Sequence, residues 1–304
     1  MQDKIVKRVK REPDNPLSTL LGMLSPTPQE ELERLQPEFF DPPGNMFYTY
    51  KLGALSPYGE ENAALVRSLA KAGSLRTDAF TADSAREFRA YSGRLNSLSK
   101  TFLARLDAGE KEPGVPGDTQ AHSLVRVPAI VARYAGSAIC RDAIGDAVRV
   151  HQTEQVATDY AQALGAILEA VVLGAPLADA LKWAAFSKDS PLYDGQRKEV
   201  SNALAEMGAD PRAVTSKMGI SCSLPGPFIG PLALCFSNGG DFVKSVRANI
   251  FGGGDNCSRA AVVGALCGAQ GGMEALPKSW TDKVTGWAEL EAAADKIVAD
   301  AGYV

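Results

Sequence analysis

A glycine-rich segment stands directly before a stretch of small residues near the C-terminal end of the sequence. Residues 251–260 read FGGGDNCSRA, and residues 261–269 continue as AVVGALCGA. Consecutive glycines let the backbone adopt positive φ and approach a ligand closely. At a helix start, side-chain oxygens coordinate a hard cation or bind a sugar, and the first amides attract an anion. The candidate site residues are Gly253, Gly254, Asp255, Asn256, Cys257 and Ser258.

Two other interpretations of this segment stay open. Asp255 and Ser258 are residue types that cap helices, so their role is structural in the simplest case. Cys257 is a nucleophile in a second interpretation, because a helix N-terminus favours a thiolate, and a small apolar filler in a third. The glycines, the acid and the long Gly/Ala-rich stretch together exceed what a cap requires. We therefore expect a binding site here.

The elements that must position these residues are helices. Apolar residues recur at helical spacing along most of the sequence, and strand-like alternation is almost absent. One helix is expected to end at Gly73, and Thr81 is expected to cap the next. Further stripes indicate helices at 98–106, 124–134, 156–173, 261–269 and 287–298, one opened by Asp210 and Pro211, and one carrying Phe242, Val246 and Ile250. The sequence predicts an all-α fold, a single compact bundle of many helices.

The N-terminal part of the sequence differs from this pattern. Residues 1–15 are rich in Lys and Arg and predict a flexible basic tail, so the helical domain is expected to span 16–304. A capping box predicts a short helix over 27–35, and the aromatic, Pro- and Gly-rich segment 37–57 predicts an ordered loop packed on the core. The segment 110–117 is the best candidate for a further boundary, but it is short.

Composition narrows the function classes. The chain has 304 residues with 32 Lys and Arg against 36 Asp and Glu, and this mild acidic excess is spread along it, so no nucleic-acid partner is expected. No apolar run is long enough to cross a bilayer, so we expect a soluble protein. The five cysteines lack CxxC spacing and predict neither a disulfide framework nor a zinc site. Free thiols fit a cytoplasmic location. The oligomeric state is open.

The sequence GGDNCSRA at 253–260, followed by a Gly/Ala-rich helix, resembles the C-terminal signature of the ADP-ribosylglycohydrolase family, Gly-Gly-Asp-Thr-Asp-Thr before such a helix. The stretch CSLPGPF at 222–228 is similar to the branch of that family that contains the jellyfish lens J-crystallins, as are the residues Asn249-Ile250 and 277–280. His151, before a long predicted helix, resembles the family's Thr-His-x-x-Pro position. The likeness spans residues 37–280.

The resemblance implies a function. Family members bind a pair of magnesium ions through two acidic loops and hydrolyse the bond between ADP-ribose and a protein side chain or a small leaving group. It implies magnesium as cofactor, and an ADP-ribose-like small molecule or an ADP-ribosylated protein as partner. It also implies Glu60 and Asp255 as catalytic acids, the same two residues with Ser258 as metal ligands, and a substrate-binding set of Asp118, His151, Gly253, Gly254, Asn256 and Cys257.

The chain departs from the family pattern at both loops. In the first, PYGEE at 57–61, Glu60 stands at the second acid and Gly59 replaces the first. Glu61 either compensates or is a solvated acid in the first turn of a helix. In the last loop Cys257 replaces an acid. The expected Gly-Asp-Ala-Leu-Gly motif does not precede residue 37. The metal site is therefore predicted to be partly degenerate, and a non-catalytic, crystallin-like structural or binding protein is the alternative function.

Three polar residues carry both a functional and a structural interpretation. Asp118 either faces a ribose or caps a helix with Gln120 in its first turn. His122 and His151 are both expected to have a structural hydrogen-bonding role more often than a catalytic one, because no acid or nucleophile is paired with them in the sequence.

Overall fold

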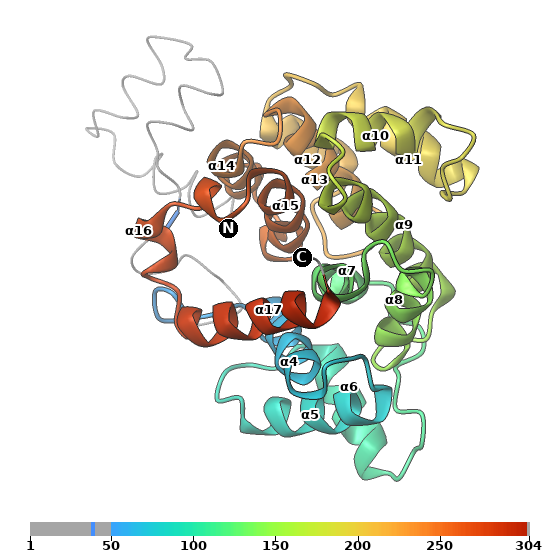
Figure 1. The fold of residues 1–304 in the computed structure, drawn as a ribbon, viewed down its shortest axis with the longest axis vertical. Helices are drawn as coiled ribbons and strands as arrows, with labels where there is room; N and C mark the ends of the chain where they lie inside the picture. Colours follow the sequence, from blue (N-terminus) through green and yellow to red (C-terminus); the bar gives the residue numbers. More distant parts are fainter. Residues whose placement is uncertain (1–37, 40–49, 303–304) are drawn as a thin grey trace.

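The computed structural model describes residues 38–39 and 50–302. Figure 1 shows these residues as helices packed against one another, and the described part contains no sheet, only isolated bridges between Val115 and Gln152 and between Gln120 and Ser223. The all-α prediction is confirmed. The predicted tail at 1–15, the helix at 27–35 and most of the aromatic loop at 37–57 lie outside the described residues.

The described helices follow one another from residue 57 to residue 301. They are α4 Pro57–Ala72, α5 Thr77–Ala90, α6 Ser97–Asp107, η1 Ala121–Arg126, α7 Val127–Tyr134, α8 Cys140–Arg149, α9 Gln155–Val172, α10 Leu177–Phe186, α11 Asp194–Leu204, α12 Pro211–Met218, α13 Gly226–Ser237, α14 Phe242–Gly252, α15 Asn256–Gly271, η2 Met273–Ala275, α16 Lys278–Thr281 and α17 Trp287–Ala301.

Local chemistry sets the ends of the first described helices. Ser56 caps α4 through its side chain, which accepts from the amide of Gly59 at 3.2 Å, and α4 ends at Gly73 with φ 73°, as predicted. The prediction that Thr81 begins the next helix is wrong, because α5 already begins at Thr77. The Thr81 hydroxyl instead donates to the carbonyl of Thr77 at 2.7 Å, the bond that a threonine inside a helix makes.

Two later helices differ in how well the sequence predicts them, since α12 begins where expected and α13 was not expected. Asp210 caps α12, accepting from the amides of Arg212 at 2.8 Å and Ala213 at 3.2 Å. The pattern did not predict α13, because Pro227 and Pro231 interrupt its sequence. That helix is buried on nearly every side, so tertiary packing compensates for the weak local propensity.

The fold brings distant segments to one place. The helix α15 packs against α4, α9, α13, α14 and η1, and α17 packs against α4 and α7 (Figure 1). The candidate boundary 110–117 is tied to the chain before α9, since the amide of Val115 donates to the carbonyl of His151 at 2.8 Å. The start of α4 and the loop before α15 are therefore held together by one core.

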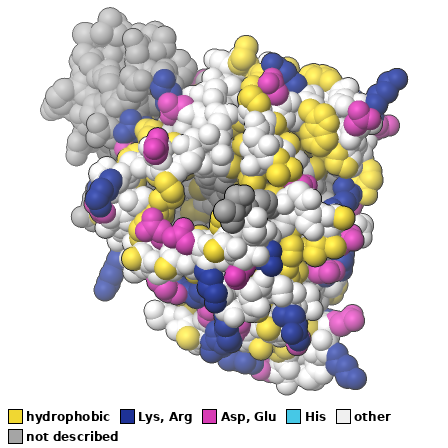
Figure 2. Space-filling model, viewed as in Figure 1, with side chains coloured by type: hydrophobic (Ala, Val, Ile, Leu, Met, Phe, Trp, Pro, Cys, Tyr) yellow, Lys and Arg dark blue, Asp and Glu magenta, His cyan; other side chains and the backbone are white. Residues whose placement is uncertain are grey.

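The described surface carries mixed charge. On the face in Figure 2, basic and acidic side chains are interspersed, with no continuous basic stripe on that side. Within residues 50–302, none of the helices has the length and apolar character that crossing a membrane requires.

Candidate functional site

The loop between α14 and α15 has the backbone that its glycines predict. Gly253 and Gly254 both adopt positive φ, 68° and 64°. A Cβ atom on Gly254 would lie 2.4 Å from the carbonyl oxygen of Ile220, so no larger residue fits without backbone movement. The predicted need for positive φ is confirmed at both positions.

A buried arginine, Arg259, fixes this loop through hydrogen bonds. Arg259 is fully buried, and its Nε donates to Oδ1 of Asn249 at 2.9 Å while its Nη2 donates to the carbonyl of Gly253. Asn249 in turn donates to the carbonyl of Asn256 at 2.9 Å. Burial lowers the pKa of Arg259 to about 10, although the nearby Asp255 opposes that shift. The sequence analysis overlooked Arg259, because arginines are seldom fully buried.

Asp255 precedes α15 but does not cap it. Its carboxylate makes no capping bond, and Oδ2 instead accepts from the hydroxyl of Tyr58 at 3.3 Å. Ser258 donates its hydroxyl to the backbone carbonyl of Asp255 at 3.2 Å. The interpretation of Asp255 as a simple side-chain cap is therefore wrong, and its carboxylate faces α4.

Tyr58 is the residue of α4 that reaches this loop. Its ring lies 4.9 Å, centroid to centroid, from the ring of His122. Burial and the charge of Asp255 raise the pKa of Tyr58, so its hydroxyl stays a donor. From the sequence, Glu60 was expected to be the residue of segment 57–61 that joins Asp255 in the site. The sequence did offer one sign of this role for Tyr58, which is a large aromatic residue between Pro57 and Gly59 in the segment that resembles an acidic loop of the family.

Further polar groups surround Asp255. The thiol of Cys222 donates to Oε1 of Gln120 at 3.0 Å, and Asp118 accepts from the amide of Gln120 at 2.9 Å. Burial raises the pKa of Cys222, and the charges of Asp255 and Asp118 add to this rise. We call Tyr58, Asp118, Gln120, Cys222, Asp255 and Cys257 the Asp255 cluster.

The structure distinguishes between the alternative roles that the sequence left open for two members of the Asp255 cluster, Asp118 and Cys257. The prediction that Asp118 caps a helix with Gln120 in its first turn is wrong, because η1 begins only at Ala121. The carboxylate of Asp118 instead accepts from the backbone amide of Gln120 at 2.9 Å and from Nε2 of Gln152 at 2.8 Å. Cys257 is half-buried, and burial together with Asp255 raises its pKa to about 11. A thiol that stays protonated at neutral pH is a poor nucleophile, which argues against the nucleophile interpretation of Cys257.

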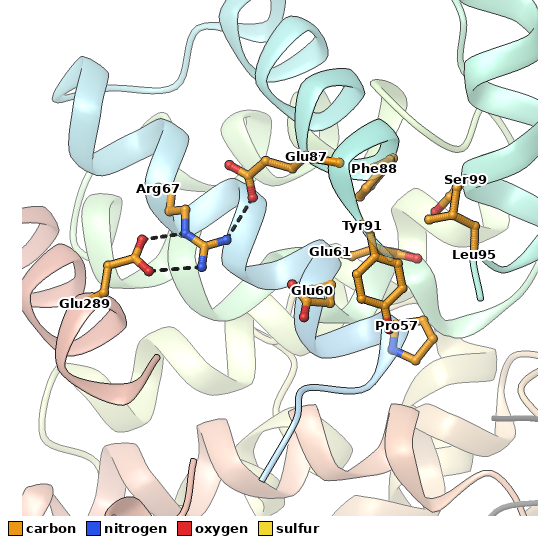
Figure 3. Close-up of a pocket in the computed structure, with 11 residues that line it drawn as sticks. Pro57, Glu60, Glu61, Arg67, Glu87, Phe88, Tyr91, Leu95, Ser99 and Glu289 are labelled. Carbon is orange, nitrogen blue, oxygen red and sulfur yellow. Dashed lines mark hydrogen bonds and ion pairs between the residues drawn. The ribbon is translucent and has the colours of Figure 1, made fainter. Parts of the chain in front are cut away.

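Glu60 lies on another side of α4. Residues two apart on a helix point about 200° apart, so Tyr58 and Glu60 project in nearly opposite directions. Glu60 lines a cavity of about 340 Å³ together with Arg67, Glu87, Tyr91 and other residues of α4, α5 and α17 (Figure 3).

The charges in this cavity are unbalanced. Arg67 donates to Glu87 at 2.8 Å and to Glu289 at 2.7 Å, and Figure 3 shows it between the two carboxylates. Burial raises the pKa of Glu60, and the charge of Arg67 opposes this only in part. The structure therefore separates the two predicted catalytic acids, with Asp255 in the Asp255 cluster and Glu60 in this cavity.

Glu61 is a buried structural acid. It is 1% exposed, accepts from Nδ2 of Asn96 at 2.6 Å, and lies 3.0 Å from Nδ1 of His122 and 3.1 Å from Nη2 of Arg126. Burial raises its pKa, but the charges of His122 and Arg126 and the hydrogen bonds outweigh burial and lower it. The interpretation of Glu61 as a solvated first-turn acid is wrong, because the helix N-terminus here is covered.

His151 lies in an aromatic enclosure. Its ring centroid is 4.5 Å from that of Phe102, 5.1 Å from Phe80 and 5.7 Å from Phe88. Neither ring nitrogen has a hydrogen-bond partner within the described part of the chain, so the predicted hydrogen-bonding role is wrong. Burial and then Arg126 lower its pKa well below the usual value.

The described residues do not fit a pair of magnesium ions. Magnesium needs an octahedral set of oxygen ligands anchored by carboxylates. No group of three or more His, Cys, Asp or Glu side chains that would hold a metal exists within residues 50–302. Glu60 points away from Asp255, and Glu61 is already paired with Arg126. The magnesium prediction, with Glu60, Asp255 and Ser258 as ligands, therefore has no support from this geometry.

Comparisons with known proteins agree with the fold. The sequence model of the ADP-ribosylglycohydrolase family matches residues 12–303. Crystallin J1A of Tripedalia cystophora is 27% identical over 279 residues, covering 86% of this chain and 84% of the crystallin. Crystallin J1B of the same organism is 26% identical over 280 residues, covering 86% and 85%. A solved structure described as an ADP-ribosylglycohydrolase-related protein complex shares the fold, with TM-score 0.67 and 20% identity over 90% of this chain and 96% of that one.

Proposed function

Because the chain belongs to the ADP-ribosylglycohydrolase family, we propose that it binds an ADP-ribose-type ligand at the Asp255 cluster and does not hydrolyse it by the family's two-metal route. The observation that carries this proposal is the 3.3 Å hydrogen bond from Tyr58 to Asp255. The neighbour of Asp255 from α4 is a neutral hydroxyl, where a two-metal site requires a second carboxylate.

The loop before α15 supports recognition of a diphosphate. The side chain of Asp255 leaves the helix without a cap, and the first amides of a helix of this length attract an anion. Gly253 and Gly254 allow the backbone to approach the ligand, and Asn256 and Cys257 lie in the first turn of α15.

Carboxylates in the Asp255 cluster support recognition of a ribose. Asp255 and Asp118 both offer oxygens that accept hydrogen bonds from sugar hydroxyls, and Gln120 offers an amide beside them. The ligand is then an ADP-ribose-like small molecule or the ADP-ribosyl group of a modified protein. Glu60 and His151 have no part in this proposal, because their surroundings lie apart from the loop.

A cytoplasmic location is part of the proposal. All five cysteines are free, and two of them, Cys235 and Cys267, lie 3.5 Å apart, sulfur to sulfur, without a bond. Cysteines without disulfide partners are typical of proteins in a reducing compartment, and this is the support for the proposed location.

Calorimetry with ADP-ribose and EDTA-treated protein tests the proposal. The wild type is expected to bind, and Asp255→Asn to bind at least tenfold more weakly, because it loses the charged acceptor for ribose. The matched control is Glu60→Gln, whose side chain lies in the separate cavity and whose affinity should equal that of the wild type. A release assay on an ADP-ribosylated peptide should show no turnover. Turnover that requires magnesium would refute the non-hydrolytic part, and absence of binding would refute the ligand.

A second candidate function is structural. The curated relatives described above are named crystallins, which supports a role that depends on folding and packing alone. In that case ADP-ribose produces no heat with any variant, and substitutions in the Asp255 cluster change only stability.

A further inference from the structure

We propose that Arg259 is a built-in cation that takes the structural and electrostatic place of a metal ion beneath the loop that carries Asp255. The inference deepens the proposed function, on which it rests only for the location of the site. Arg259 is a positioning residue in this account, because it touches the loop and not the ligand.

The geometry of Arg259 matches what a bound cation does for such a loop. A metal ion binds backbone and side-chain oxygens and fixes them in place. Arg259 donates to the carbonyl of Gly253 and, through Nε, to Oδ1 of Asn249 at 2.9 Å. Since Asn249 also holds the carbonyl of Asn256 at 2.9 Å, one guanidinium fixes both ends of the turn around Asp255.

The charge of Arg259 is close enough to that of Asp255 for the two to interact. Arg259 lies in the first turns of α15, four positions after Asp255, and the charge of Asp255 acts on its guanidinium. It is 0% exposed, so its charge is weakly screened by water, and its Nη1 has no partner within the described residues. A buried cation with incomplete hydrogen bonding is costly unless a nearby anion compensates it, and Asp255 is the acid whose charge raises the pKa of Arg259.

The acid Glu61 is also paired with a buried arginine, which supports the proposal that arginines replace metal ions in this protein. Glu61, in the segment that resembles the family's first metal loop, lies 3.1 Å from the guanidinium of Arg126, and both side chains are 1% exposed. Both acidic loops therefore have a buried arginine within the protein. A divalent cation added to Asp255 would meet the positive charge of Arg259, which disfavours binding.

The test uses magnesium chloride alone and variants that separate charge from hydrogen bonding. Arg259→Lys keeps the charge, whereas Arg259→Gln keeps a donor for Gly253 and loses the charge. Thermal unfolding of EDTA-treated protein is measured with and without millimolar magnesium. Magnesium should leave the melting temperatures of the wild type and Arg259→Lys unchanged. It should raise that of Arg259→Gln by several degrees, because Asp255 and the loop carbonyls then lack a cation.

Two controls define the outcome. The double variant Arg259→Gln with Asp255→Asn should lose the magnesium response, and Arg212→Gln, which removes an arginine packed on Phe251 nearby, should not acquire one. A magnesium response in the wild type overturns the inference, as does a folded Arg259→Gln protein without one. If Arg259→Gln does not fold, Arg259→Lys decides. A folded lysine variant that ignores magnesium supports a charge role, and one that also fails to fold overturns it. No ADP-ribose is present, so failure of the proposed function leaves this result standing.

Discussion

The hydroxyl of Tyr58 lies 3.3 Å from Oδ2 of Asp255, across 197 positions of sequence. This contact joins the first turn of α4 to the loop that precedes α15, the two segments that resemble the family's metal loops. The donor is a neutral hydroxyl, so it stabilises the charge of Asp255 but adds no second carboxylate to the site. This contact is the basis of our proposal that the site binds the hydroxyls and phosphates of a ligand and not a pair of metal ions.

Tyr58→Phe should weaken this junction without disrupting the core. Loss of one hydrogen bond to a charged acceptor is expected to lower the free energy of unfolding by about 1.5 to 3 kcal/mol, and less if water replaces the hydroxyl. Denaturant unfolding measures the change. Tyr91→Phe is the matched control, since Tyr91 lines the Glu60 cavity, and it should alter the stability by less than Tyr58→Phe does. Equal losses in the two variants would contradict a special role for the bond to Asp255.

Gly254→Ala should destabilise the protein. The new Cβ would lie 2.4 Å from the carbonyl of Ile220, and φ is 64°, so we expect a loss of about 1 to 3 kcal/mol. Gly264→Ala in α15 is the control, because nothing lies within 4 Å of its Cβ position. Higher helix propensity should make that variant more stable by up to about 1 kcal/mol. Melting curves of the two proteins should move in opposite directions.

Arg126→Met should be among the most destabilising single changes in the chain. It leaves Glu61 buried at 1% exposure without its guanidinium partner, and breaking a buried pair from one side costs about 3 to 5 kcal/mol. Arg149→Met, which removes an exposed partner of Asp146, should cost about 0 to 1 kcal/mol. Unfolding in guanidinium chloride gives both free energies. Similar losses in the two variants would show that Asn96 and His122 alone stabilise the buried charge of Glu61.

Acid should destabilise the fold through His151. Its pKa is lowered in the folded protein by its aromatic enclosure, so the unfolded chain takes up the proton first as the pH falls. The stability is complete above the unfolded pKa of about 6.5 and decreases below it by up to about 1.4 kcal/mol per pH unit, until the lower folded pKa is reached. His151→Phe should remove this contribution. Unfolding free energies measured between neutral and mildly acidic pH test it, and an unchanged slope in the variant would show that other groups cause the acid sensitivity.

The sequence predicted the helices better than the contacts between them. The capping of α12 by Asp210 and the end of α4 at Gly73 follow from local chemistry, and both are confirmed. The helix α13 was missed because its burial, and not its proline-containing sequence, stabilises it. Periodicity assigns a face only to an apolar stripe, so it gave no reason to prefer Tyr58 over Glu60 as the partner of Asp255. That choice depends on the rotation of α4 against α15, which only the tertiary structure determines.

Cys257→Asp tests how far the site is from binding a metal. The substitution restores the acid that the family pattern has at this position and places a second carboxylate near Asp255, which adds an anchoring ligand for magnesium and negative charge to offset that of Arg259. Calorimetry should detect magnesium binding in this variant and none in the wild type, because the thiol, with a pKa of about 11, offers no anionic ligand. Cys257→Asn has nearly the same shape without the charge and should behave like the wild type. Adding Asp255→Ala to Cys257→Asp should abolish the heat. If the wild type binds magnesium as tightly as Cys257→Asp, then Asp255 and its neighbours already form a metal site, and the metal-independent account of this protein fails.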